Sequence, residues 1–330
     1  MNSLANYALK NGGSVYPLIL PADITNGTGI MNPSVYIDGD KILVNIRHVN
    51  YTFFHSEEKT FQHPWGPLTY LHPEEDMHLR TTNYYCEIND AFKIARFDKV
   101  DTSKFDTYEP QWDFVGLEDA RIFRWDNKLY LSGVRRDTTT NGEGRMELSE
   151  IIVTTNTVKE ISRVRIPPPQ DPNSYCEKNW MPVLDMPYHY VKWGNPTELV
   201  SVDPINKTSK TEIISNLIPL PRDLRGGSQI IKLGDYRVAI THEVDLFNSA
   251  VGRKDAIYKH RIIVWDKNWN IVKHTDDFSI MDAHVEFAIG MCEYKNDILI
   301  SFGFQDNAAY LLKLPTQAFK EFVGINNENN

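Results

Sequence analysis

The chain has 330 residues, of which 41% are apolar and 24% charged, a balance typical of a globular protein with a large core. Its net charge of −9 and the absence of a basic block argue against a nucleic-acid partner, and no apolar run approaches the roughly 18 residues of a membrane helix. The first residues lack the apolar segment of a signal peptide, and Cys86, Cys176 and Cys292 are widely spaced. We therefore expect a cytoplasmic protein with reduced thiols and no membrane partner.

Short segments rich in Val, Ile, Tyr and Phe alternate with Gly, Asp and Asn, and no long window shows the apolar stripe of a helix. This pattern predicts an all-β protein. Pairs of apolar runs joined by turn-forming residues predict β-hairpins over residues 32–47, 116–135, 177–192, 225–243 and 284–303. Further strands are expected at residues 150–155, 162–166, 197–202, 210–215 and 260–273.

The spacing of the five hairpins leaves room for about four strands in each repeat. Such repetition predicts a five-bladed β-propeller that forms a single domain over residues 1–330, with a β-sandwich as the alternative. Residues 51–114 contain four histidines in no regular pattern, so we expect a long insertion loop there and a polar tail at residues 322–330. The histidines lack the spacing of metal ligands, and we expect neither a metal nor a cofactor.

The hairpin over residues 116–135 opens with Glu118, Asp119 and Arg121. Charges at the mouth of a hairpin add nothing to the apolar alternation that a strand needs. They form either a surface cluster of salt bridges or a site in which an arginine holds an acid.

Polar residues occupy the ends of strands in every predicted hairpin. The first strand of each propeller blade lines the central channel, so we expect these residues to meet at one end of it. Carboxylates beside cations in a concave site suit a polyhydroxylated or anionic ligand. Each residue alone also has a structural interpretation, such as an ion pair or a strand-end histidine, and the hypothesis therefore depends on their convergence.

Three short motifs carry a resemblance to a known group of enzymes. Asn32-Pro33-Ser34-Val35, Glu118-Asp119-x-Arg121 and Glu177-Lys178-Asn179-Trp180-x-Pro182 resemble motifs of the five-bladed propeller glycosidases and mannoside phosphorylases. The related β-1,2-mannosyltransferases are similar, and the resemblance spans residues 30–310.

The resemblance implies that Asp119 is the proton donor, because it matches the aspartate of the Asp-Pro-Arg motif in mannoside phosphorylases. Ala120 replaces the proline of that motif. In the phosphorylases, basic residues that bind phosphate follow the Phe-Pro of the third blade. Here Val183 follows Met181-Pro182, a departure that argues against phosphorolysis.

We therefore expect an enzyme that cleaves or transfers a glycosidic bond, with Asp119 as general acid, because a glycosidic oxygen leaves readily only when it is protonated. Inverting hydrolysis needs a second carboxylate, for which Glu177 and Glu286 are the candidates and Glu243 a weaker one. The residues expected to bind substrate are Arg47, Glu118, Arg121, Lys178, Asn179, Arg225, His242 and Glu243.

Three functions stay open from the sequence. The first is a hydrolase or phosphorylase, with a β-mannoside as the substrate that the resemblance suggests. The second is a glycosyltransferase of surface polysaccharide synthesis that uses a sugar nucleotide or a sugar phosphate. The third is a sugar-binding propeller without chemistry. A carbohydrate is the expected ligand in each case, with inorganic phosphate or a sugar nucleotide as the second reactant of the enzymes.

Overall fold

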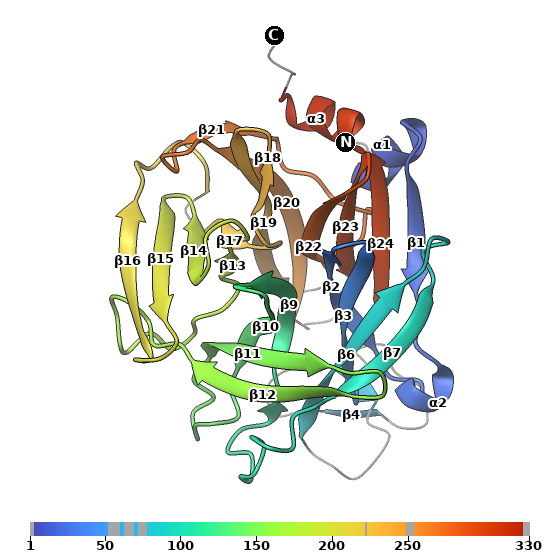
Figure 1. Cartoon of the computed structure of the whole chain (residues 1–330), viewed down its shortest axis with the longest axis vertical. Helices are drawn as coiled ribbons and strands as arrows, with labels where there is room; N and C mark the ends of the chain where they lie inside the picture. The colour runs from blue at the N-terminus through green and yellow to red at the C-terminus, as the bar shows by residue number, and fades with distance from the viewer. Residues whose placement is uncertain are drawn as a thin grey trace.

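Strands make up most of the computed structural model, which describes residues 3–51, 60–62, 69–71, 78–221, 223–248 and 254–325 (Figure 1). Within these residues the helices are short: α1 (Leu4–Lys10), α2 (Ala22–Thr25) and α3 (Thr316–Val323). None of them is long and apolar enough to cross a bilayer. The predicted all-β class is confirmed.

The strands form sets of antiparallel neighbours that follow one another along the chain. One set is β2 (Ile30–Asp38), β3 (Lys41–Val49), β6 (Leu79–Ile88) and β7 (Ile94–Asp101). The next is β9 (Glu118–Trp125), β10 (Lys128–Arg135), β11 (Arg145–Val153) and β12 (Val158–Arg165). Then come β13 (Met181–Pro182), β14 (His189–Gly194), β15 (Thr197–Asp203) and β16 (Thr208–Ile214).

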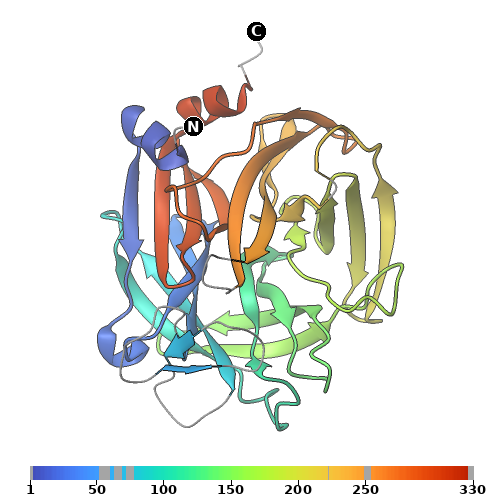
Figure 2. The same cartoon turned by 180° about the vertical axis from the view of Figure 1, so that it is seen from behind.

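The fourth set contains β17 (Arg225–Gly226), β18 (Ile231–Leu233), β19 (Tyr236–Asn248), β20 (Lys254–Trp265) and β21 (Ile271–His274). The last is β22 (Glu286–Tyr294), β23 (Asp297–Phe304) and β24 (Ala308–Pro315), joined by β1 (Ser14–Leu18). Outside these sets, β8 (Phe114–Val115) pairs with β6, and β4 (Thr60–Gln62) pairs with β5 (Thr69–Leu71). The sets lie around a common centre in both views (Figures 1 and 2).

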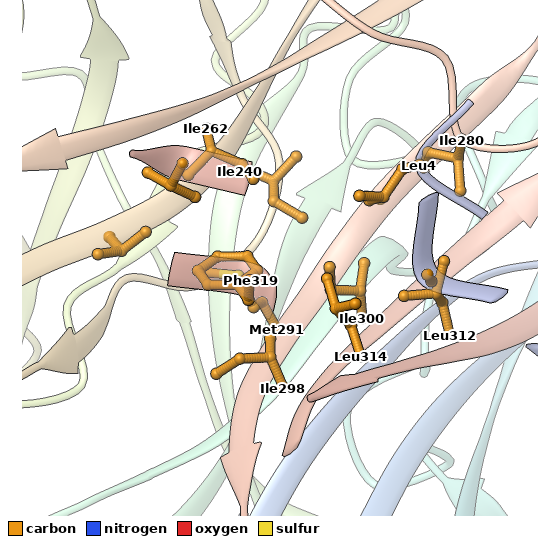
Figure 3. Packing of buried hydrophobic residues seen from close by; sticks show 14 of the residues in the cluster. Leu4, Ile240, Ile262, Ile280, Met291, Ile298, Ile300, Leu312, Leu314 and Phe319 are labelled. Atoms are coloured by element: carbon orange, nitrogen blue, oxygen red, sulfur yellow. The ribbon is translucent and has the colours of Figure 1, made fainter. Parts of the chain in front are cut away.

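The two ends of the chain are joined in one sheet. β1 runs antiparallel to β24, from Ser14 opposite Lys313 to Leu18 opposite Ala309. Gly13 precedes this pairing, and a Cβ there would lie 2.4 Å from the carbonyl oxygen of Lys313, so only glycine fits. Next to this sheet, Leu4 of α1 and Phe319 of α3 belong to one buried cluster, part of which Figure 3 shows. The cluster also includes Ile240 of β19 and Ile262 of β20, so the terminal segments share a core with the last and the fourth sets.

Most of the strands expected from sequence are present. All five hairpins form, and the outer strands include the predicted β11, β12, β15, β16 and β21. The predicted insertion loop at 51–114 is wrong in part, because β6 and β7 lie within it and complete the first set. The chain also remains helical to Val323, so the helix extends into the predicted polar tail. His55, His63 and His72 of the predicted loop and the tail beyond residue 325 lie outside the described residues.

Buried polar side chains connect the strands nearest the centre. Ser301 of β23 accepts from the backbone N–H of Val35 (2.9 Å) and donates to the carbonyl of Pro33 (2.6 Å). Gln229 donates to the carbonyl of Val35 (2.6 Å). At Gly290 a Cβ would lie 2.3 Å from the nitrogen of Val35, so β22 approaches β2 too closely for a side chain. These contacts hold in place the strand ends that carry the candidate site.

Candidate active site

A cavity of about 170 Å³ lies where strands of different sets converge. Residues from β2, β3, β9, β17, β19, β20 and β22 line it, together with the segment before β13 and the turn between β23 and β24. The residues around it are Met31, Asn32, Arg47, Tyr51, Phe114, Glu118, Asp119, Lys178, Asn179, Arg225, His242, Tyr258, Phe287 and Asp306.

Four of these residues share an unusual backbone conformation. Asn32, Asp119, Asn179 and Asp306 have φ of 45°, 50°, 62° and 49°, in the left-handed region that residues with a Cβ seldom adopt. The β2–β3 ladder shifts register beside Asn32, and the β9–β10 ladder shifts beside Asp119. Such irregularities re-aim side chains, and strained backbone of this kind clusters at functional sites.

Asp119 accepts two hydrogen bonds on the same carboxylate oxygen. Asn32 Nδ2 and Arg47 Nη1 each donate to Oδ1 over 2.8 Å. Burial alone would raise the pKa of Asp119, but the charge of Arg47, the amide of Asn32 and the charge of Arg121 together lower it below its ordinary value. In the ligand-free cavity Asp119 is therefore a carboxylate at neutral pH.

Arg47 is placed between two acids. Its Nη2 lies 3.3 Å from Glu118 Oε2, and its Nε donates to Thr81 Oγ1 over 3.0 Å. Burial opposes the charge of Arg47, yet the neighbouring carboxylates raise its pKa above the ordinary value. Glu118 Oε1 is buried without a hydrogen bond, and Arg136 Nε is 3.8 Å from it. Arg47 and Glu118 therefore hold Asp119 in a fixed arrangement at the cavity.

Arg121 does not have the role that the sequence suggested. It is absent from the cavity lining, and its guanidinium donates to the carbonyl oxygens of Gly227 (2.8 Å) and Asp119 (2.8 Å). Burial lowers its pKa to about 10. Arg121 thus ties β9 to the segment after β17 and stabilises the backbone at Asp119, so the prediction that it contacts substrate is corrected.

Lys178 and Arg225 bring positive charge to the cavity. Both line it, Lys178 exposed and Arg225 half-buried. Neither side chain makes a hydrogen bond or an ion pair with a described residue, and the charge of Lys178 acts on the nearby Asp306. Cations without an ion-pair partner in a concave site favour the binding of an anion.

His242 lies beside these cations and stays neutral. Burial lowers the pKa of His242 well below its usual range, and His260, Arg225 and Lys178 lower it further. Its Nδ1 is buried without a hydrogen-bond partner among the described residues. The ring stacks on Tyr258, with centroids 5.6 Å apart and planes 7° apart. His242 can therefore accept or donate one hydrogen bond to a ligand without adding charge.

Asp306 also lines the cavity, and the sequence analysis missed it. It lies in the turn between β23 and β24 with φ of 49°. Burial and the nearby charge of Asp119 raise its pKa to about 6, against the opposing charges of Arg47 and Lys178. The only sequence signal was its place at the far end of the fifth hairpin, where a turn of Gln, Asp and Asn is ordinary.

Glu177 and Glu243 do not line the cavity. Glu177 is buried and accepts from Trp180 Nε1 and Lys192 Nζ, each over 3.1 Å. Glu243 points to Arg261, whose Nε lies 2.8 Å away. Both carboxylates accept hydrogen bonds or ion pairs from neighbouring side chains, and neither faces the cavity as a catalytic or binding candidate.

Glu286 is a structural anchor. It is fully buried and accepts three backbone N–H bonds from the loop at residues 280–283, the shortest two over 2.5 and 2.6 Å. Burial raises its pKa above the ordinary value. It fixes that loop instead of activating water. Elsewhere in the described chain, no three His, Cys, Asp or Glu side chains are grouped so as to hold a metal ion.

No family model and no curated protein matches the sequence. Among solved structures, the chain is similar to a β-1,2-mannobiose phosphorylase from Listeria innocua, with a TM-score of 0.55 and 10% identity over 94% of this chain and 99% of that one. It is similar to MPT-4, a mannose phosphorylase from Leishmania mexicana (TM-score 0.53, 12% identity, 96% and 93% covered). MPT-1, a GDP-Man-dependent mannosyltransferase from the same organism, gives a TM-score of 0.52 at 11% identity, with 92% and 90% covered. The resemblance predicted from the motifs is thus confirmed as a remote likeness, and at these identities it shows the fold that the chain shares with mannoside phosphorylases.

Proposed function

We propose that the protein is a carbohydrate-active enzyme that transfers a glycosyl unit between a glycoside and a phosphate group. The fold would be a five-bladed β-propeller in one domain, with each set of strands as a blade and the cavity at its centre. The strand sets and the fold of the similar structures support this architecture.

One observation carries the proposal: an aspartate with positive φ, fixed by two hydrogen bonds, and two cations without an ion-pair partner among the described residues line the same small cavity. Asp119 is fixed by Asn32 and Arg47, while Lys178 and Arg225 form no ion pair with the described residues. Glycosyl transfer to phosphate needs these two parts, a carboxyl group for the glycosidic oxygen and cations for the phosphate.

Phosphate as the second reactant is favoured over water. An inverting hydrolase needs a second carboxylate to activate water. The predicted candidates Glu177, Glu243 and Glu286 are engaged elsewhere, which leaves Asp306 of the cavity for that role, whereas the two cations favour an anion as the reactant. Val183 supplies no phosphate ligand, since it is fully buried in the core. Lys178 and Arg225 would take that role, with His242 and Tyr258 as neutral hydrogen-bonding partners of the phosphate.

The proposed substrate is a β-mannoside, because the similar phosphorylases and the similar transferase act on mannose compounds by name. We propose that Asp119 protonates the leaving oxygen, as the resemblance implies. Removal of such an acid lowers turnover by about 10²- to 10⁴-fold.

The cytoplasmic location expected from composition stays a prediction, and the three cysteines form no disulfide in the described structure.

The test is an assay of the purified protein with β-1,2-mannobiose, with and without inorganic phosphate, read out as mannose 1-phosphate. We expect mannose 1-phosphate only when phosphate is present. The Asp119→Asn variant should form none, while its melting temperature stays that of the wild type. Release of mannose without phosphate would replace phosphorolysis by hydrolysis. Product from GDP-mannose alone would establish a transferase, and binding of mannobiose without any turnover would leave a sugar-binding propeller.

A further inference from the structure

Three carboxylates line the cavity, those of Glu118, Asp119 and Asp306, and the surroundings of the two aspartates differ. Asp119 accepts hydrogen bonds from an amide and a guanidinium. Asp306 lines the same cavity from the turn between β23 and β24. Its side chain accepts no hydrogen bond and forms no ion pair among the described residues. A carboxylate held by donors stays ionised, whereas one without donors beside a like charge is the group that takes up a proton.

The charged groups around Asp306 come from several elements. Asp119 of β9 raises its pKa, and Arg47 of β3 and Lys178 before β13 lower it; burial is the largest influence and raises it. Tyr258 of β20 also faces both acids, and its pKa is raised by burial and by the charges of Asp306 and Asp119. The two aspartates share one cavity, the charge of Asp119 acts on Asp306, and Asp306 is the one that has no donor to stabilise its ionised form.

The turn that carries Asp306 is fixed. Gln305 and Asp306 both have positive φ, 54° and 49°. Gln305 also makes a reciprocal pair of hydrogen bonds with Val285: its N–H donates to the carbonyl of Val285 over 2.7 Å, and its Oε1 accepts from the N–H of Val285 over 2.9 Å. Backbone strain that is held by paired bonds places the Asp306 side chain at the cavity.

The proposed general acid Asp119 is ionised in the empty cavity, so a proton must reach it or the substrate from elsewhere. We propose that Asp306 is a second catalytic carboxyl group, which holds the proton of the Asp119–Asp306 pair and supplies it for departure of the leaving group. This inference rests on the proposed function and adds to it the source of the proton.

The step balances without another reactant. The C–O bond to the leaving sugar breaks as a phosphate oxygen bonds to the anomeric carbon. The proton of the pair passes from Asp306 by way of Asp119 to the leaving oxygen, which departs as a hydroxyl group. The attacking hydrogen phosphate loses its own proton when it becomes a glycosyl phosphate, and that proton restores the pair.

Leaving-group dependence separates proton supply from sugar binding. In Asp306→Asn we expect turnover of a methyl β-mannoside to fall about 100-fold, since its leaving group needs a proton. Turnover of a 2,4-dinitrophenyl β-mannoside should fall little, because 2,4-dinitrophenolate leaves as a stable anion. Asp119→Asn should show the same contrast. Equal losses of both substrates in Asp306→Asn would indicate a binding residue and overturn the inference. Asp126→Asn is the matched control, because Asp126 is an exposed turn residue with φ of 47°.

A titration without substrate tests the pair independently of the reaction. With aspartate labelled by ¹³C at the side-chain carboxyl, we expect one signal that titrates at pH about 6, is lost in Asp306→Asn and moves to lower pH in Asp119→Asn. The inference would be overturned if the signal persists in Asp306→Asn, or if its titration midpoint is the same in Asp119→Asn as in the wild type. If the wild-type protein transfers no glycosyl group while the titration is as expected, the proposed function fails and the carboxyl pair stands.

Discussion

Two clusters of charged residues lie on the same β9–β10 hairpin, and they differ in how their charges are paired. At the end of β10, Arg135 lies 2.9 Å from Glu147 and 3.2 Å from Asp137, and all three side chains are almost fully buried. At the start of β9, Asp119 faces a cavity in which Lys178 and Arg225 have no partner.

The difference teaches that charge alone does not mark a site. The Arg135 cluster contains more buried charge than many active sites, yet each group neutralises another. Asp137 also accepts from the N–H of Gly116 over 3.0 Å, so this cluster fixes the segment that leads into Glu118 and Asp119. The cavity has charges that the protein leaves unpaired, and these are the ones available to a ligand.

The largest expected effect is on the paired cluster. Arg135→Met would leave Asp137 buried without its cation and Glu147 with Arg163 and Arg165 alone, and breaking such a pair costs about 3–5 kcal/mol in the free energy of unfolding. Denaturant unfolding measures this loss. Lys41→Met is the control, because Lys41 pairs with Glu87 while 61% of its side chain is exposed, and a change below about 1 kcal/mol is expected there. Similar losses in both variants would contradict the contrast drawn above.

Glu286→Gln should cost less, about 1–3 kcal/mol, because one of its oxygens becomes an NH₂ group facing backbone N–H donors of the loop at 280–283. Thermal unfolding checks the loss of stability. Glycosyl-transfer turnover below the melting temperature should stay within a few-fold of the wild type. A loss of turnover as large as that of Asp119→Asn, in a folded protein, would return Glu286 to the catalytic candidates.

Arg225→Met tests the unpaired side of the comparison. Losing one charged hydrogen bond to phosphate weakens binding by about 1.5–3 kcal/mol, or roughly ten- to hundredfold in Kd. Stability should not fall, because the side chain of Arg225 makes no hydrogen bond or ion pair with any residue that the structure describes. Isothermal titration with inorganic phosphate measures the change. Arg237→Met, which removes an ion pair with Asp185 outside the cavity, should leave phosphate binding unchanged. An unaltered Kd in Arg225→Met would show that the anion binds elsewhere.

The sequence could predict where polar residues lie along the strands better than what they touch. Hairpin periodicity placed Asn32, Asp119, Lys178, Arg225 and His242 at strand ends, and all five line one cavity. The motif resemblance identified the fold because three short motifs keep their order, even though overall identity to the similar structures is only 10–12%.

The failures have physical causes. The sequence does not reveal that Trp180 and Lys192 donate to the carboxylate of Glu177 and keep it out of the cavity lining. Asp306 was not singled out because the sequence of a turn does not show which residues will surround it in space. β6 and β7 were predicted as loop because residues 79–88 do not alternate apolar and polar side chains as a half-buried strand does.

His260 shows a third way to bury a titratable group, and it carries the smallest predicted effect. It is fully buried opposite His242 in the β19–β20 ladder, and burial lowers its pKa to about 3. At neutral pH it is uncharged in both the folded and the unfolded chain, so it neither pairs with an acid nor attracts a ligand. Below pH of about 6.5 this histidine is protonated in the unfolded chain but stays neutral in the folded chain. The free energy of unfolding should therefore fall by about 1.4 kcal/mol for each pH unit of acidification.

His260→Gln should reduce this slope, since glutamine keeps an acceptor for the N–H of Ala288 but does not titrate. Urea unfolding between pH 6.5 and 4 measures the slope, and His274→Gln at an exposed position should leave it unchanged. His242 remains in both variants and retains its own part of the acid sensitivity, because its pKa is also lowered well below the usual range. If the slope of His260→Gln equals that of the wild type, His260 is protonated in the folded protein, and a buried positive charge then lies opposite His242 in the β19–β20 ladder.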